Sequence, residues 1–544
     1  MKKIVTLSLI ATMALTGVHA VSNAKLASQL NALETELADV KKQLKKQNKK
    51  INKVKAHDAG DNIKWGADLR TAIDNINYDM ADGTSAGKSD LMSLRLWLNM
   101  AYAPDSHNVF KGQLSMNKAF GADFRDPFTT PGGSRALSLG GMFDWTGNEA
   151  LTDNSLKVRQ AYWLYLGDEA FGLDMPWTFS LGRRPSTNGF LANLRDDDPA
   201  QSPLGHVINV EFDGLSSKLD LSNITGIPGM SIKLCMGQGS TNASPLFATA
   251  TPYANEGNQL EDIQLAGFIF EPYNDGQFIV KSTWYKAFDL PGMDAIPTIS
   301  GNPLNPSLSI APSAFTQYGD MQGAALSVLV DGLTDDGYFA DAKLFASFAW
   351  SKTSPQGGVN PNTGAAYQML GSEDSETGTS FWIGAQLPVT EKGVFGLEFN
   401  QGSQYWRPFT YAEDTMIGSK IATRGNAIEA YFTYQLTDAL SAQVRYTKLD
   451  YEYTGSQGFF GNFSGASNKI SDIKAGAAAF TQLGGTVDAT GAQNIGVVTG
   501  NLIAQGLDPA TAQATAGQMA GAAVFAPNVV EAAEDFRFYI RYRF

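Results

Sequence analysis

The chain has 544 residues, of which 43% are hydrophobic and 17% charged, with a formal net charge of −13. A helical membrane protein would show further runs of about 20 apolar residues and a higher mean hydropathy than −0.17. The low charge, the 55 glycines and the 11% aromatic residues instead favour a transmembrane β-barrel, in which only every second strand residue faces lipid.

Residues 1–20 predict a signal peptide. Lys2 and Lys3 precede an apolar stretch at 4–18, and Val-His-Ala at 18–20 forms a small-residue cleavage site. The alternative, an uncleaved anchor, is disfavoured because the apolar stretch is shorter than the roughly 20 residues of a membrane span. We therefore expect an exported protein of the cell outer membrane of a Gram-negative bacterium.

The cysteine and histidine content excludes several kinds of site. Cys235 is the single cysteine, which rules out an intramolecular disulfide and cysteine-based haem, iron–sulfur or zinc sites. The histidines after the signal, His57, His107 and His206, lack metal-ligand spacing and are interpreted as isolated polar residues at turns. We expect no metal and no cofactor. The chain also lacks a catalytic Ser/His/Asp or paired-carboxylate pattern, so we do not expect an enzyme.

Residues 21–60 predict a short periplasmic α-helical coiled coil, because apolar residues step alternately by four and three. The seam consists of Leu26, Leu30, Leu33, Leu37, Val40, Leu44, Gln47, Ile51 and Val54. An isolated helix of this length is marginal, so we expect a homo-oligomer, with a trimer favoured although the seam does not fix the number. The alternative is a lone amphipathic helix at the periplasmic mouth.

The outer face of this helix is basic, with eight lysines between positions 41 and 55. One hypothesis is attraction to the acidic peptidoglycan of the periplasm. A solvated coiled-coil surface is the favoured alternative. Nucleic acid is excluded by the compartment, so the expected partners are outer-membrane lipid, the barrel assembly machinery and further copies of the chain.

After residue 60 the period of the apolar residues changes from 3.5 to 2, which predicts strands with one apolar face. The predicted strands are 62–77, 91–103, 108–119, 156–167, 177–184, 206–213, 231–238, 262–270, 277–288, 322–330, 338–352, 380–387, 394–401, 423–436, 440–453 and 535–544. Short turns alternate with long loops between them, which is typical of an outer-membrane barrel and not of a soluble sandwich.

The fold class is therefore all-β, an antiparallel up-and-down barrel over residues 61–544 with about 16 strands, and 18 as the runner-up. Residues 215–221 would make an extra strand after a turn at Asp213-Gly214, but that strand would break the alternation of turns and loops. We therefore assign 214–230 to one long periplasmic turn.

The last strand alternates aromatic and basic residues and ends in Phe544. This pattern resembles the C-terminal assembly signal of outer-membrane barrels. The alternative, an ordinary soluble edge strand, is disfavoured because such an exposed apolar face promotes aggregation in water.

Alternation also predicts which charged residues face the interior and line a channel. The basic ones are Arg70, Arg95, Lys111, Arg159, Arg184, Arg445, Arg537 and Arg541, and the acidic ones are Glu211, Glu398 and Glu429. The basic residues lie on the first five and last two strands, which become contiguous when the barrel closes. They form either one basic wall that selects ions or a set of partners for loop carboxylates.

A constriction loop is predicted at 185–205, with Arg195, Asp196, Asp197 and Asp198 as its candidate residues. A calcium site built from the aspartates is the weaker alternative, because three adjacent carboxylates cannot all reach one ion. The loop at 121–154 is a second candidate. The link at 454–534 is the longest, and helices are predicted within it at 475–483 and 510–524. We expect this link to cap the outer mouth of the barrel, to plug its lumen or to bind something outside.

Several segments resemble an uncharacterised family of porin-like outer-membrane proteins, known as a domain of unknown function. The similar segments are SLGRRPST at 180–187, GHVINVEFDG at 205–214, GLEFNQGSQYW at 396–406, TRG at 423–425 and YTGS at 453–456. The resemblance implies a porin-like barrel and assigns no residue roles. The long Ala- and Gly-rich link before the last strand departs from the compact ending expected of that family.

A barrel of 16 strands is too wide to be filled by strand side chains alone, which predicts an aqueous channel unless a loop folds in. The favoured function is a porin-like channel for small hydrophilic solutes or ions. Two alternatives stay open: a structural protein that tethers the membrane to peptidoglycan through the coiled coil, and an adhesin-like display of the 454–534 region.

Overall fold

The computed structural model describes residues 63–121, 151, 154–241, 260–302, 305–334, 337–410, 416–456 and 458–544. The predicted signal peptide and coiled coil, and most of the loop at 121–154, lie outside these residues. The barrel and its loops form one compact unit of residues 63–102 and 107–544. None of the helices in the described residues is long and apolar enough to span a membrane.

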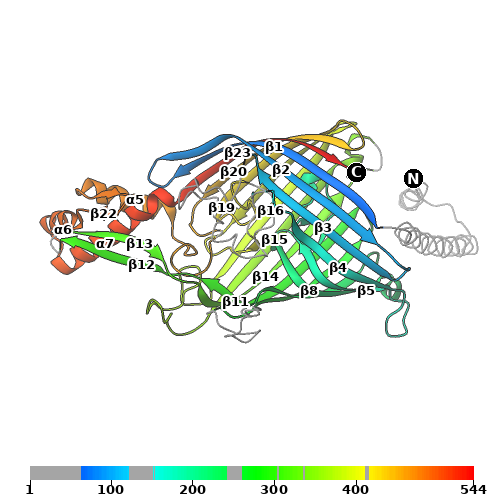
Figure 1. Ribbon diagram of the computed structural model, residues 1–544, viewed down its shortest axis with the longest axis horizontal. Helices are drawn as coiled ribbons and strands as arrows, with labels where there is room; N and C mark the ends of the chain where they lie inside the picture. Colours follow the sequence, from blue (N-terminus) through cyan, green and yellow to red (C-terminus); the bar gives the residue numbers. More distant parts are fainter. Residues whose placement is uncertain are drawn as a thin grey trace, which may run out of the picture. The chain divides into compact units, whose positions relative to one another are not determined.

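Sixteen antiparallel strands form a closed barrel (Figure 1). They are β1 (Lys64–Met80), β2 (Ser85–Tyr102), β3 (Asn108–Ala119), β4 (Lys157–Gly167), β5 (Trp177–Ser186), β8 (Ile208–Asp220), β9 (Ser231–Ser240), β10 (Ile263–Asn274), β11 (Phe278–Gly292), β14 (Thr316–Asp331), β15 (Lys343–Pro355), β16 (Thr377–Thr390), β17 (Gly393–Gly402), β19 (Gly425–Gln435), β20 (Leu440–Tyr451) and β23 (Val530–Arg543). The first and last strands pair, with Thr71 opposite Ile540. The predicted fold class and strand number are confirmed.

The strands are stable as a barrel because their side chains alternate between two environments. On β23, Phe536, Phe538, Ile540 and Tyr542 point outward and are 39–51% exposed, whereas the intervening Asp535, Arg537, Tyr539 and Arg541 are at most 3% exposed. An apolar outer face around a polar inner face is the pattern of a barrel that meets lipid.

The predicted turn at 214–230 is wrong. β8 continues through Asp213 and Gly214 to Asp220, and the turn that follows contains only the short helix α4 (Ser222–Thr225). Gly214 lies opposite Gly182 of β5 and Gly237 of β9, and a Cβ atom there would come within 2.1 Å of the Met236 carbonyl oxygen. The glycine serves the close approach of neighbouring strands rather than a turn.

Part of the barrel interior is filled by an inserted segment, residues 187–207, which connects β5 to β8. It contains β6 (Gly189–Phe190), the 3-10 helix η2 (Leu194–Asp196) and β7 (Gln201–Leu204). A second connection carries β18 (Phe409–Thr410), which pairs in parallel with the start of β8. Phe190, Leu204 and Phe409 pack with Trp406 and with inner-face residues of β10 to β16 in one hydrophobic core.

The 454–534 region builds a cap together with the β11–β14 connection. Its elements are α5 (Ile470–Gln482), β21 (Thr486–Asp488), β22 (Gly491–Gln493), α6 (Ile495–Ala504), α7 (Pro509–Phe525) and η4 (Ala526–Asn528), and the β11–β14 connection adds the hairpin of β12 (Ala295–Asn302) and β13 (Asn305–Pro312). Leu308 of β13 pairs with Ala492 of β22. Figure 1 shows these elements grouped beyond the ends of the barrel strands.

The cap has its own small core, in which every fourth residue of α7 is a buried alanine that lets the helices approach closely. Two of its helices correspond to the predicted helices, and α6 was not predicted. A cavity of about 1170 Å³ lies between the cap and the barrel, lined among others by Tyr78 of β1, Tyr451 of β20 and Phe525 of α7.

Candidate functional site

Arginines from neighbouring strands form two rows on the inner face of the barrel. Arg70 of β1 lies opposite Arg95 of β2 on one side and Arg541 of β23 on the other. Four residues from Arg541 along β23, Arg537 lies opposite Arg445 of β20. Barrel closure therefore joins residues from the two ends of the chain into a continuous basic wall, defined here by Arg70, Arg95, Arg445, Arg537 and Arg541.

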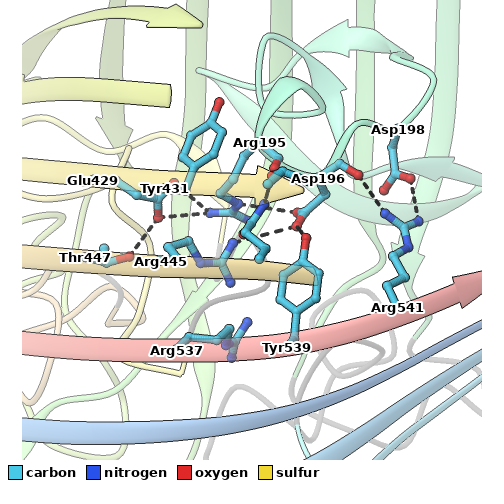
Figure 2. A network of polar contacts seen from close by, with 12 residues as sticks. Arg195, Asp196, Asp198, Glu429, Tyr431, Arg445, Thr447, Arg537, Tyr539 and Arg541 are labelled. Carbon is cyan, nitrogen blue, oxygen red and sulfur yellow. Dashed lines mark hydrogen bonds and ion pairs between the residues drawn. The ribbon is translucent and has the colours of Figure 1, made fainter. Parts of the chain in front are cut away.

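The inserted segment meets this wall through two of its three adjacent aspartates, Asp196 and Asp198 (Figure 2). Asp196 accepts a hydrogen bond from the Tyr539 hydroxyl at 3.2 Å and lies 3.7 Å from the Arg445 guanidinium. Asp198 binds Arg541 at 2.6 Å, and Asp197 binds Arg543 at 2.5 Å.

The backbone of the inserted segment makes this arrangement possible. Asp197 follows η2 in the left-handed conformation, with φ 50° and ψ 46°, a region that aspartate tolerates better than most residues. The sharp change of direction aims the three carboxylates at different partners. They therefore do not converge on one point. Among the described residues, no group of three or more His, Cys, Asp or Glu side chains could hold a metal ion.

Arg195 of the inserted segment reaches an acidic pair on β17 and β19. Its guanidinium lies 3.3 Å from Glu429, which also binds Lys420 at 2.5 Å and accepts a hydrogen bond from Thr447 at 2.8 Å. Lys420 in turn binds Glu398 at 2.6 Å. Two cations from connecting segments are thus held by two strand carboxylates.

Aromatic rings and further carboxylates support the remaining arginines. Arg95 and Arg159 stack on the ring of Trp97, at 3.7 and 4.3 Å from its centroid. Arg159 also binds Glu211 at 3.0 Å. Glu211 also lies 3.1 Å from the Arg183 guanidinium.

The predicted lining residues divide into three groups by exposure. Nine are buried, namely Arg70, Arg95, Arg159, Arg445, Arg537, Arg541, Glu211, Glu398 and Glu429, each at most 5% exposed. Arg184 is half-buried and Lys111 is exposed. The buried residues contact one another and the inserted segment, so at their level they do not border open water.

Several residues of this network were not among the predicted site residues. Asp68 binds Arg541 with a 2.9 Å hydrogen bond, and Asp74 binds Arg537 at 2.5 Å. Both aspartates share the inner face of β1 with Arg70, so the alternation contained the signal needed to find them. Lys420 lies in a connection without periodicity, where no such signal exists.

His206 is also placed differently from the prediction. It was interpreted as an isolated polar residue at a turn, but it is completely buried beside the rings of Trp382 and Trp406. Its ring nitrogens lie 2.8 Å from the Ser347 hydroxyl and 2.9 Å from the Ser380 hydroxyl. Burial lowers the pKa of His206 to about 3, so the ring stays neutral at physiological pH and fastens the inserted segment to β15 and β16.

Comparison with known proteins identifies one family. A family model described as "Protein of unknown function (DUF3373)" matches residues 86–495. This confirms the resemblance to an uncharacterised family and extends it toward the N-terminus. No curated protein sequence matches the chain significantly.

The chain is also similar to several solved structures. The outer-membrane expressed OmpT of Vibrio cholerae has a TM-score of 0.40 at 10% identity, covering 89% of this chain and 97% of that one. Salmonella typhi OmpF, in complex with daunomycin, has a TM-score of 0.41 at 11% identity, covering 90% and 99%. The anion-selective porin from Comamonas acidovorans has a TM-score of 0.42 at 10% identity, covering 89% and 99%.

Proposed function

We propose that this chain, which belongs to the DUF3373 family of proteins of unknown function, is a porin-like outer-membrane channel for small hydrophilic solutes or ions. The observation that carries the proposal is the closed barrel with an apolar outside and a charged inside, whose inserted segment is ion-paired to a basic wall. No catalytic role is part of this proposal.

The outer surface supports placement in a lipid bilayer. Outward-facing side chains such as Leu326, Phe348, Leu397 and Phe536 are 49–52% exposed, a large apolar area for a protein in water. The connections at one end of the barrel are short, for example 275–277 and 391–392, whereas those at the other end are long, for example 356–376 and 452–529. This asymmetry supports short turns in the periplasm and long loops outside.

The interior supports restricted rather than wide passage. On the side of β10 to β16 the hydrophobic core fills the lumen. The polar route runs along the basic wall, where Asp68, Asp74, Asp196 and Asp198 are already paired with arginines. Because these carboxylates neutralise much of the wall, we expect weaker ion selectivity than the unpaired arginines would produce.

Single-channel recording of the purified, detergent-folded protein in a planar bilayer tests the proposal. Discrete conductance steps, with an ion preference altered by neutralising Arg95 or Arg541, are the expected result. A correctly folded, heat-modifiable barrel that gives no steps would contradict a pore. Heat-modifiability (the different electrophoretic mobility of folded and unfolded barrel) reports folding independently of conductance.

A structural role is the second candidate, and the packing of the interior favours it. The inserted segment, the β17–β19 connection and the inner faces of β10 to β16 bury large side chains together, including Trp382 and Trp406. A barrel that only anchors residues 21–60 to the membrane needs no open lumen. Deleting 21–60 separates the candidates, because a pore keeps its conductance whereas a tether loses its attachment to the cell wall.

A further inference from the structure

A small pocket lies on the inner wall at β5 and β8 to β11, remote in the strand order from the basic wall. It has a volume of about 50 Å³, and its lining includes Arg184, Lys233, Ser202, Ser216, Phe212 and Tyr285. At about 10–15 Å³ for each water, this volume holds a few water molecules. The pocket is therefore sized for a small solute.

Two cationic side chains, Arg184 and Lys233, line this pocket. Lys233 of β9 lies directly opposite Lys218 of β8 in the strand register, and its ammonium group lies 2.5 Å from the Ser202 hydroxyl of the inserted segment. Arg184 contacts the hydroxyls of Ser180 and Ser216. Like charges placed directly opposite each other on one sheet face are destabilising, so this arrangement favours a bound negative charge.

These three cations differ from inner cations such as Arg541 and Lys281 in having no acidic partner among the described residues. Arg541 has Asp68 and Asp198, and even Lys281, nearby on β11, has Glu271 at 3.6 Å. Within the described part of the chain, none of Arg184, Lys218 and Lys233 forms an ion pair with a carboxylate, and the buried Nε of Arg184 has no hydrogen-bond acceptor. Uncompensated charge of this kind is costly to bury.

Part of the lining is apolar. Ile208, Phe212 and Leu265 border the pocket and belong to the hydrophobic core. An inorganic anion would use the cations and the serine hydroxyls and leave this surface uncovered. A carboxylate on a short apolar chain would satisfy the cations and also cover the apolar wall.

We infer that this pocket is a binding site for small organic anions, with Arg184 and Lys233 holding the carboxylate and the Phe212 side of the pocket receiving the apolar part. A role of this binding in solute passage rests on the proposed function. The binding itself does not depend on that function.

Saturation-transfer NMR on the full, detergent-folded protein tests the inference, with butyrate as the probe and butyramide as its uncharged counterpart. We expect butyrate to bind and butyramide not to bind. Each of Arg184→Gln and Lys233→Gln should weaken butyrate binding about tenfold, as expected for the loss of one charge-assisted hydrogen bond. Lys111→Gln is the matched control, because it removes an inward lysine away from the pocket, and it should leave binding unchanged.

Three results would overturn the inference: absence of butyrate binding, equal binding of butyramide, or equal weakening by Lys111→Gln. Displacement of butyrate by an equal concentration of inorganic phosphate would overturn the apolar part of the assignment. The probe comparison uses the unaltered protein, so it stays decisive even if a variant fails to fold. A protein that conducts but does not bind butyrate refutes the pocket alone, whereas one that binds butyrate but does not conduct refutes the channel alone.

Discussion

Arg541 on the last strand donates a 2.6 Å hydrogen bond to Asp198 of the inserted segment, 343 residues earlier in the chain. The same guanidinium binds Asp68 on the first strand and the Asp196 backbone carbonyl oxygen at 2.6 Å. Burial raises the pKa of the Asp198 carboxyl, while Arg541 and Arg95 act to lower it. The Arg541 side chain therefore links the junction of the first and last strands to the inserted segment inside the barrel.

Replacing Arg541 should loosen both this junction and the inserted segment. Arg541→Gln leaves Asp68 and Asp198 without their main partner, and removing one member of a buried ion pair typically costs about 3–5 kcal/mol. We expect a lower midpoint of urea unfolding and, in planar bilayers, larger and noisier conductance steps because the inserted segment is less firmly held.

Lys88→Gln is the control for this experiment. Lys88 also forms an ion pair, with Asp90 at 3.1 Å, but both side chains are more than 60% exposed, and exposed pairs contribute little. Equal changes in the two variants, or unchanged conductance in a folded Arg541→Gln protein, would show that Arg541 does not hold the inserted segment.

Neutralising Glu429 should shift the ion preference toward anions. Glu429 is the shared partner of Arg195, Lys420 and Thr447, so Glu429→Gln removes one negative charge from a site that retains its cations. The reversal potential in a potassium chloride gradient measures the shift. Glu373→Gln, at an exposed position in the β15–β16 connection, removes the same charge outside the lumen and should move the potential less. A shift toward cations in Glu429→Gln would contradict the passage of ions along a route on which they sense the charge of Glu429.

His206 should make stability depend on pH. Its pKa is about 3 in the folded chain and about 6.5 when unfolded, so the unfolded state binds a proton first as the pH falls. The contribution to stability is full above about pH 6.5 and declines down to about pH 3, by about 1.4 kcal/mol for each pH unit inside that window.

His206→Gln keeps a hydrogen-bonding side chain but does not titrate. The difference in unfolding free energy between this variant and the unaltered protein should therefore change steadily between pH 6.5 and pH 4. His107→Gln, at the turn before β3, controls for loss of a histidine elsewhere. A difference that is independent of pH would mean that His206 is charged or accessible to water in the folded barrel.

Removing Phe544 should impair assembly in the membrane more than stability of the finished barrel. Its backbone forms two 3.0 Å hydrogen bonds with Ala67 of β1, while its ring is 74% exposed on the outer face. We expect a truncation after Arg543 to reduce the folded, heat-modifiable fraction in cells. Phe171→Ala, which removes an 87% exposed ring from the β4–β5 turn, should have little effect. Normal cellular assembly of the truncated chain would rule out an assembly signal at Phe544.

How much could be predicted from the sequence depended on whether the signal was local. Alternation along β23 predicted which side chains face outward, and the same rule placed Glu398 and Glu429 inside. The predicted constriction loop at 185–205 overlaps the inserted segment. The partners of this segment could not be predicted, because Asp196 meets Tyr539 and Arg445 only after residues some 250 to 340 positions apart are brought together by barrel closure.

The sequence by itself determined the class of fold, since the period of two and the alternation of short turns and long loops are properties of neighbouring residues. Only the tertiary structure decided that Gly214 lies within a strand, that His206 is buried and that the predicted lining residues Arg95, Arg159, Arg445, Arg537 and Arg541 are paired with carboxylates. These outcomes depend on which distant groups share the interior. A buried charge is stable only when it is paired. The folded barrel, and not the local sequence pattern, decides which charged residues lie close enough to pair.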